Sequence, residues 1–391
     1  MPGSIQKRGN NKYLLTVSTG FDLFGKRIRH TKTITANSDA EAEKQLALFY
    51  AEVMKGDIRN DRNITLGKYI EYWIKTKGKK LARKTISEYK KLAKRINEAL
   101  GHIRLSKLKP RHLQEFYDLL REPDARLDGK EGPLSENAIS HYHRFLHAVL
   151  ETAVKVDKLI PENPAKEVQD PPTPGRPRPK YYDEEQTAKL LEALEGVTGR
   201  FFKYKVFIIL TLFLGARRGE ILGLEWKDID WDKGIIHIQR DSEYTESDGI
   251  YVDDTKNETS IRDVSVPQEI LDLLREYKAW QNKQRLKKGD KWIDTDRLFT
   301  QHDGKPMHPD TVSSWFSDFV KENNLPPITV HGLRHTNASI MIANNIDIIT
   351  VAGRLGHADK ATTARIYAHM LKSSDRKATE RLADTLLRQK K

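Results

Sequence analysis

Cysteine is absent from the 391 residues of this chain. Its absence excludes disulfides, thiolate zinc sites and a cysteine nucleophile, and it fits a reducing compartment. Long hydrophobic runs are absent too, because no stretch approaches the roughly 18 apolar residues of a membrane span. The first residues also lack the apolar core of a secretory signal. We therefore expect a cytoplasmic protein.

Acidic residues are too few to balance the basic ones. Lys and Arg number 68 against 55 Asp and Glu, which gives a formal net charge of +13. Such an excess indicates an anionic partner. Nucleic acid is the first candidate, since neutralised phosphates release counterions. A membrane surface is the alternative, but the polybasic amphipathic helix or lipidation motif that it needs is not evident. In a bacterial cell we expect association with the nucleoid.

Residues 1–58 predict a small α+β domain with a three-stranded sheet and one helix. Runs of β-branched and aromatic residues at Tyr13–Ser18 and Arg27–Ile34 indicate strands. Ser38 and Glu41 have the spacing of a capping box that opens a helix. The domain is too small for a large core, so we expect it to carry charge to DNA. Its candidate DNA-binding residues are Lys7, Arg8, Arg27 and Arg29.

Residues 62–165 predict an all-α domain. Leu66, Tyr69, Ile70 and Trp73 follow helical spacing. The polar faces of these helices carry many basic residues, which are either solvated surface or a DNA contact. The candidates for DNA contact are Lys79, Lys80, Arg83 and Lys84.

Residues 166–182 are rich in proline and predict an extended, semi-rigid linker. Arg176 and Arg178 make this linker cationic, so it is either a further DNA contact or a plain spacer. Residues 183–391 then predict a mainly α-helical domain with a small antiparallel sheet. The sheet is expected from strand-like runs at 235–239, 249–253 and 262–266.

The last domain contains residues suited to handling a phosphodiester. Arg217 follows an apolar helix and Gly215, with Glu220 three residues on. A guanidinium can hold two phosphate oxygens by charge-assisted bonds, although most arginines beside glutamate are surface pairs. Lys256 lies between two strand-like runs, as a hairpin lysine would. It could protonate a leaving oxygen, although such a lysine is usually solvated.

His331, Arg334 and His335 occupy positions i, i+3 and i+4 and so share one face of a helix. A helical pair of histidines can indicate zinc, but the glutamate of the zinc-protease motif and any cysteine are missing. An arginine between the histidines favours an oxyanion over a cation. We therefore expect neither a metal nor another cofactor.

Tyr367 lies ten residues beyond His357 of a Leu-Gly-His sequence. A tyrosine is a poor nucleophile near neutral pH because its pKa is about 10. Arginines and a histidine around a phosphate would help by stabilising the developing charge. Taken alone, Tyr367 would be read as an ordinary tyrosine of an amphipathic helix.

The order and spacing of these segments resemble the catalytic domain of the lambda-integrase, or tyrosine recombinase, family. The resemblance is carried by Gly215-Ala216-Arg217 with Glu220, by Lys256, by His331 with Arg334 and His335, by Leu355-Gly356-His357 and by Tyr367. The helical domain resembles the core-binding domain of the family. The N-terminal domain resembles the arm-binding domain of phage and conjugative-transposon integrases. Ala216, in place of a larger apolar residue, and an inserted loop at Leu127–Pro133 depart from the pattern.

The resemblance implies a site-specific recombinase that cuts and rejoins DNA through a 3′-phosphotyrosine at Tyr367. It implies that Arg217 and Arg334 hold the non-bridging oxygens and that His357 adds a hydrogen bond. Lys256 is the candidate acid and His331 the candidate base, with His335 and Glu220 in support. It also implies a homotetramer on core and arm DNA sites, in which the tail Leu371–Lys391 docks on a neighbouring subunit. An excision factor or a host DNA-bending protein would be further partners.

Three other functions compete with this interpretation. A type IB topoisomerase shares the chemistry, but the two N-terminal DNA-binding domains favour a recombinase. A non-catalytic DNA-binding or architectural protein would explain the charge, but it leaves the catalytic set unexplained. A resolvase of chromosome dimers usually lacks an arm-binding domain, so residues 1–58 count against it.

Overall fold

The computed structural model describes residues 3–21, 27–54, 64–175, 179–254 and 261–356. The chain forms two compact units, Met1–Arg176 and Pro177–Lys391. The boundary between them lies within the segment for which the sequence predicts a linker. Each unit is described by itself.

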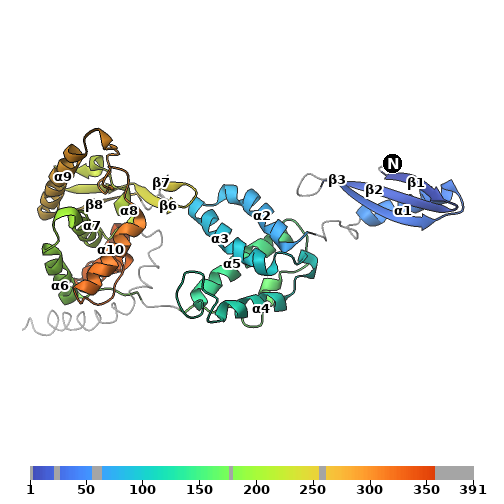
Figure 1. Ribbon diagram of the computed structural model, residues 1–391, viewed down its shortest axis with the longest axis horizontal. Coiled ribbons are helices and arrows are strands. Elements are labelled where there is room, and N and C mark those ends of the chain that lie inside the picture. The colour runs from blue at the N-terminus through green and yellow to red at the C-terminus, as the bar shows by residue number, and fades with distance from the viewer. Residues whose placement is uncertain (1–2, 22–26, 55–63, 176–178, 255–260, 357–391) are drawn as a thin grey trace, which may run out of the picture. The chain divides into compact units, whose positions relative to one another are not determined.

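The N-terminal part of the first unit is a three-stranded antiparallel sheet with one helix on one face (Figure 1). Its elements are β1 (Gly3–Gly9), β2 (Lys12–Phe21), β3 (Arg27–Thr35) and α1 (Asp39–Met54). β2 is central and alternates buried with half-buried residues, as a strand with one covered face should. Leu15 and Val17 of β2 pack against Leu46, Phe49 and Val53 of α1. The expected sheet and helix are confirmed, and β1 supplies the strand that the sequence did not locate.

The start of α1 differs in detail from a capping box. The hydroxyl of Ser38 accepts a hydrogen bond from the backbone N–H of Glu41, as expected. The carboxylate of Glu41, however, accepts from the N–H of Asn37 and not from that of Ser38. The reciprocal bond therefore forms one residue before the cap.

In the described remainder of the first unit, four α-helices carry the core. They are α2 (Leu66–Lys77), α3 (Arg83–Leu100), α4 (Pro110–Arg121) and α5 (Glu136–Lys155). The four residues of α2 predicted from helical spacing are all buried. Trp73 meets the ring of Phe145 edge-on and donates its indole N–H to the hydroxyl of Thr152 at 2.9 Å. The same core extends past α5 to Val168, which is also buried.

The second unit is built around α7, a helix buried on nearly all sides. Its helices are α6 (Glu184–Glu195), α7 (Phe202–Leu214), α8 (Arg218–Gly223), α9 (Gln268–Lys288), α10 (Pro309–Glu322), α11 (Val330–Ala343) and α12 (Ile348–Leu355). Its strands are β4 (Ile229–Asp230), β5 (Ile235–Ile238), β6 (Arg240–Thr245), β7 (Gly249–Asp254) and β8 (Arg262–Ser265). A capping box of Asp183 and Gln186 opens α6, with both of its hydrogen bonds formed. Tyr182, just before it, is buried in the core of this unit.

The strands described in the second unit form two small sheets instead of one. β4, β5 and β8 make an antiparallel sheet in that order, and β6 and β7 make a separate hairpin. The two strand-like runs that flank Lys256 therefore do not pair with each other, because β7 pairs with β6 and β8 pairs with β5. The interpretation of Lys256 as a residue of a hairpin between these runs was wrong. β7 and β8 belong to different sheets.

In the part of the chain that the structure describes, no helix combines the length and the apolarity needed to cross a membrane.

Candidate active site

The turn between α7 and α8 is where the site begins. α7 ends at Leu214, and Gly215 follows in the left-handed conformation with φ of 60°. A side chain at this position would be strained by the backbone, and its Cβ would lie 2.6 Å from Oδ1 of Asn337. The chain therefore reverses sharply and presents Arg217 at the N-cap of α8.

Arg217 donates two hydrogen bonds to the carboxylate of Glu220, three residues on. The carboxylate of Glu220 accepts from the backbone N–H of Arg217 at 2.8 Å and from Nη1 of the same residue at 2.7 Å. Glu220 is buried, whereas the Arg217 side chain is 38% exposed. Glu220 thus fixes the main chain and the side chain of Arg217 and leaves part of its guanidinium open to a ligand.

α11 brings together the three residues predicted to share a helix face. The rings of His331 and His335 meet edge-on with centroids 4.9 Å apart. Arg334 lies between them in the sequence and is only 3% exposed. Its Nη1 donates to the carbonyl oxygen of Gly215 at 2.9 Å, so α11 is tied directly to the turn that carries Arg217.

Both histidines are held towards the neutral form. Burial lowers the pKa of His335 to about 4, with help from the neighbouring His331 and Arg334. His331 is exposed at the surface, yet desolvation by nearby atoms and the charges of Arg334 and Arg217 also lower its pKa. Both rings are therefore unprotonated near pH 7 and each keeps one ring nitrogen as an acceptor.

The C-terminal end of α12 reaches the same turn. Gly356 has φ of 67° and ends the helix, and its carbonyl oxygen accepts from Nη2 of Arg217 at 3.4 Å. Lys256, His357 and Tyr367 lie outside the described residues. Among the described residues, no cluster of His, Asp and Glu has an arrangement that could hold a metal ion.

Sequence reasoning missed three residues that build this site. Nδ2 of Asn337 donates to the carbonyl oxygen of Leu212 at 2.7 Å, and Arg354 donates to that of Phe213 at 2.8 Å. Together with Arg334 they satisfy carbonyls at the end of α7. The third residue, Arg262, donates to the Glu220 carboxylate at 2.8 Å. A basic residue at the start of an otherwise ordinary strand was the available signal for it.

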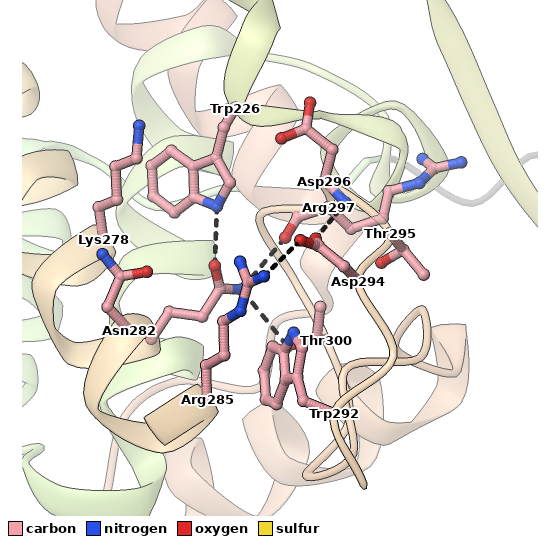
Figure 2. A pocket seen from close by; sticks show the side chains of 11 residues that line it. Trp226, Lys278, Asn282, Arg285, Trp292, Asp294, Thr295, Asp296, Arg297 and Thr300 are labelled. Atoms are coloured by element: carbon pink, nitrogen blue, oxygen red, sulfur yellow. Dashed lines mark hydrogen bonds and ion pairs between the residues drawn. The ribbon is translucent and has the colours of Figure 1, made fainter. Parts of the chain in front are cut away.

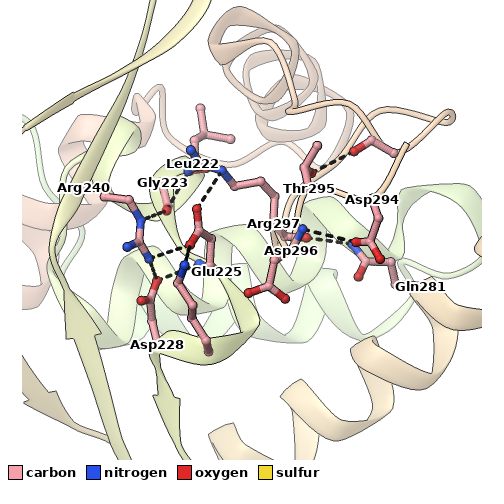
Figure 3. A network of polar contacts seen from close by, with 12 residues as sticks. Leu222, Gly223, Glu225, Asp228, Arg240, Gln281, Asp294, Thr295, Asp296 and Arg297 are labelled. Atoms are coloured by element: carbon pink, nitrogen blue, oxygen red, sulfur yellow. Dashed lines mark hydrogen bonds and ion pairs between the residues drawn. The ribbon is translucent and has the colours of Figure 1, made fainter. Parts of the chain in front are cut away.

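A second polar network holds the other end of α8 (Figure 3). Nη1 of the buried Arg297 donates to the carbonyl oxygens of Gly223 at 2.7 Å and Leu222 at 3.3 Å. Arg240 donates to Gly223 as well and pairs with the carboxylates of Asp228 and Glu225. α8 has only two turns of helix, so these contacts supply the order that its length cannot.

A pocket near this network lies apart from the predicted site (Figure 2). Trp226, Trp292 and Thr300 are among its lining residues, and an ion pair of 2.9 Å joins Arg285 to Asp294 within it. Trp226 donates its indole N–H to Gln281 at 2.7 Å. None of the described residues that we expect to be catalytic lines this pocket.

The candidate DNA-binding residues of the N-terminal sheet fall on different faces. Nε of Arg27 donates to the hydroxyl of Ser18 at 3.1 Å, and Arg29 is the register partner of Ser18. Ser18 points away from α1, since its neighbour Val17 is buried beneath that helix. Lys7 instead lies over the ring of Tyr13, which is buried with Ala42 of α1. Arg27 and Arg29 therefore share the open face, and Lys7 does not.

Most of the other candidates for DNA contact are exposed in the described part of the chain. Lys79 and Lys80 are exposed in a short 3-10 turn after α2, and Arg83 and Lys84 are exposed in the first turn of α3. Arg8 is exposed beside the bulge of β1. Arg176 and Arg178 fall outside the described residues.

Comparison with known proteins agrees with this geometry. A model of the phage integrase family matches residues 180–374, and a model of the N-terminal SAM-like domain of phage integrases matches residues 65–120. A tyrosine recombinase XerC-like protein of Caldanaerobacter subterraneus is 27% identical over 97% of this chain and 98% of that protein. The ICEBs1 integrase of Bacillus subtilis is 27% identical over 98% of this chain and all of that protein.

Solved structures share the fold. The Tn1549 transposon integrase, in complex with a circular intermediate DNA, aligns with a TM-score of 0.66 at 22% identity, over 82% of this chain and all of that one. A lambda integrase dimer bound to a core site aligns with a TM-score of 0.56 at 15% identity, over 93% of each chain. The arrangement of Arg217, His331 and Arg334, the two family models and the nearly full-length relatives lead to one conclusion: the chain belongs to the phage integrase family, the tyrosine recombinases.

Proposed function

We propose that this recombinase is the integrase of a mobile DNA element and that Arg217 and Arg334 stabilise the scissile phosphate during strand cleavage. The observation that carries the proposal is the convergence of both arginines on the Gly215 turn. Arg217 starts α8 directly after this turn, and Arg334 donates to the carbonyl oxygen of Gly215. Their positive charges are available before the reaction starts, so little reorganisation is needed when charge builds up on the phosphate.

The chemistry is a pair of transesterifications. The hydroxyl oxygen of Tyr367 attacks phosphorus, a 3′-phosphotyrosyl bond forms, and the bond to the 5′ oxygen breaks. Lys256 gives a proton to the departing 5′ oxygen, His331 accepts the tyrosine proton, and His357 donates a hydrogen bond to the phosphate. The lowered pKa of His331 keeps its ring unprotonated near pH 7, as a proton acceptor must be. The bond energy is kept in the phosphotyrosine, so rejoining needs no ATP.

The domains divide the work of DNA recognition. We assign residues 1–58 to arm-type sites, 62–165 to core sites and 183–391 to catalysis, with 166–182 as the linker. The exposed Arg27 and Arg29 on the open face of the N-terminal sheet support a DNA contact there. Two DNA-binding domains on one chain raise the effective concentration of each for its own site.

Exchange between two duplexes requires four strand cleavages and therefore four active sites. Lambda integrase has been solved as a tetramer bound to a Holliday junction. We infer a homotetramer for this chain as well, with the tail Leu371–Lys391 docked on a neighbouring subunit. An excision factor or a DNA-bending protein of the host would set the direction of the reaction.

The test is covalent capture on a suicide substrate that carries the end of the element and a nick near the cut. The wild type should form a protein–DNA adduct that resists denaturant. Tyr367→Phe should bind the same DNA and form none. An adduct formed by Tyr367→Phe would refute the nucleophile, and binding without an adduct by either protein would favour a DNA-binding role.

A further inference from the structure

Arg262 is a buried arginine that the catalytic scheme leaves without a role. It is the first residue of β8, and its side chain is 7% exposed. Nη2 donates to Oε2 of Glu220 at 2.8 Å, and Nε donates to the carbonyl oxygen of Arg354 at 2.7 Å. A buried guanidinium is costly unless its charge is compensated by well-placed acceptors, so these contacts should tolerate little change in geometry.

Glu220 is shared between this arginine and Arg217. Its Oε2 accepts from Nη2 of Arg262 and from the backbone N–H of Arg217, and its Oε1 accepts from the Arg217 side chain. Two guanidiniums thus share the negative charge of one carboxylate. The positive charge of Arg217 is therefore less completely neutralised than it would be in a simple ion pair, and its side chain is 38% exposed. Without Arg262, the buried carboxylate of Glu220 would have two courses. It would either pair with Arg217 alone, or take up a proton and no longer hold Arg217.

Arg262 also borders the end of α12. It holds the carbonyl of Arg354 in the last turn, and a Cβ at Gly356 would lie 2.7 Å from its Nη1. The carbonyl oxygen of Gly356 in turn accepts from Arg217. The contacts of one guanidinium therefore link β8, the start of α8 and the end of α12.

We propose that Arg262 is a positioning residue for strand cleavage, which acts through Glu220 to orient Arg217 and to keep its charge available to the scissile phosphate. It does not touch the DNA itself. The inference rests on the proposed function in one respect, namely that Arg217 neutralises charge on the non-bridging oxygens.

The test compares two suicide substrates that differ in one substituent on the scissile phosphorus. One has a normal scissile phosphate, and the other has a methylphosphonate, in which a methyl group replaces a non-bridging oxygen and removes its negative charge. A variant that has lost charge stabilisation should be slow on the phosphate and should recover on the methylphosphonate. A variant that is merely less stable should be impaired equally on both.

Arg262→Gln should cleave the phosphate about 10- to 100-fold more slowly than the wild type, as expected for a misplaced catalytic group. On the methylphosphonate its rate should approach that of the wild type, in parallel with Arg217→Ala. Combining the two substitutions should add little to the loss caused by Arg217→Ala alone, because both act on one interaction. Arg262→Lys keeps the charge but has no fork to serve both acceptors, so it should recover part of the rate.

Arg275→Gln is the matched control, since Arg275 lies in the same unit and pairs with Asp272 on the surface of α9. It should cleave both substrates at the wild-type rate. Thermal melts and DNA affinity are measured for every variant. If Arg262→Gln unfolds under assay conditions, Arg262→Lys carries the same comparison.

Two outcomes would overturn the proposal, and they are distinct. If Arg217→Ala recovers on the methylphosphonate but the Arg262 variants do not, Arg262 serves the fold and the role of Arg217 stands. If Arg217→Ala is itself impaired equally on both substrates, Arg217 does not neutralise the phosphate, and both assignments fall.

Discussion

Glu220 shows how much a single buried carboxylate can organise. It is 2% exposed and accepts three hydrogen bonds from two arginines. Burial alone would raise its pKa, but the hydrogen bond and charge of Arg262, aided by Arg217, outweigh burial and lower the pKa below its ordinary value. The carboxylate is therefore ionised at neutral pH, as the two guanidiniums require.

Glu220→Gln keeps the shape of this side chain and removes its charge. Because two guanidiniums then lose their anion, the free energy of unfolding at pH 7 should fall by about 3 kcal/mol. Since the pKa of Glu220 is lowered in the folded state, its stabilisation is present above its unfolded pKa and is lost as the pH falls through the folded value. The difference in free energy of unfolding between the wild type and Glu220→Gln should therefore become smaller in acid.

Urea unfolding at pH 7 and under acidic conditions measures this gap. Glu185→Gln is the control, because Glu185 is exposed in an ion pair with Lys189 and should contribute little. A Glu220→Gln protein as stable as the wild type at pH 7 would contradict the prediction.

For single residues, the sequence predicts contacts between partners that are close along the chain. The spacing of Arg217 with Glu220, and of His331 with His335, was sufficient to predict that each pair lies together, because helical geometry brings residues three and four apart onto one face. Arg262 lies 42 residues from Glu220, and Asn337 lies 125 residues from Leu212. No local periodicity connects such partners, so their roles became visible only in the folded chain.

Among the elements, the end of α7 is the point on which the site depends. Its last carbonyls accept hydrogen bonds from Asn337 and Arg354, and the carbonyl of Gly215 accepts from Arg334. α11 and α12 are thereby attached to the same turn that presents Arg217. A change in the path of this turn would move all of them.

Gly215→Ala makes such a change with one methyl group. The left-handed backbone of Gly215 strains any other residue by about 1–3 kcal/mol, and the new Cβ would press on Asn337. We expect a loss of stability in that range in thermal or urea unfolding, together with slower adduct formation.

Gly196→Ala provides the comparison, because Gly196 has an ordinary φ of −69° at the end of α6 and a Cβ there would meet nothing closer than 3.8 Å. Its unfolding and its rate should match those of the wild type. Equal behaviour of the two alanine variants would show that the turn tolerates a side chain.

The elements were predictable where they are apolar and periodic. The apolar residues before Gly215 and the spacing in α2 identify buried helices, and the structure confirms both. β6 was missed because its sequence, RDSEYT, has the polar composition of a loop. Without β6, the run at 249–253 lacked its true partner, and pairing across Lys256 was the natural but wrong choice.

At the scale of the whole molecule, the proposed assembly sets the timing of cleavage. If the tail docks on a neighbouring subunit, a protomer alone lacks the contact with a neighbour's tail. Tetramer formation would then limit cleavage to complexes in which four sites are present.

Removal of all residues after Ser373 tests this idea. The shortened protein should bind a core site with near wild-type affinity but form fewer tetramers on DNA, as measured by sedimentation, and should lose ordered cleavage of paired sites. Removal of Gln389–Lys391 alone is the control for the loss of terminal charge. Unchanged assembly and cleavage by the longer deletion would count against a shared tail.

The packing of Val168 and Tyr182 has a practical consequence for altering target choice. Val168 is buried with the helices of the first unit, and Tyr182 is buried with those of the second. Each unit thus keeps its own anchor, and a splice made between these two residues would leave both cores whole. Chimaeras that take the first unit from one integrase and the second from another should therefore fold, and they would reveal which half of the molecule chooses the DNA.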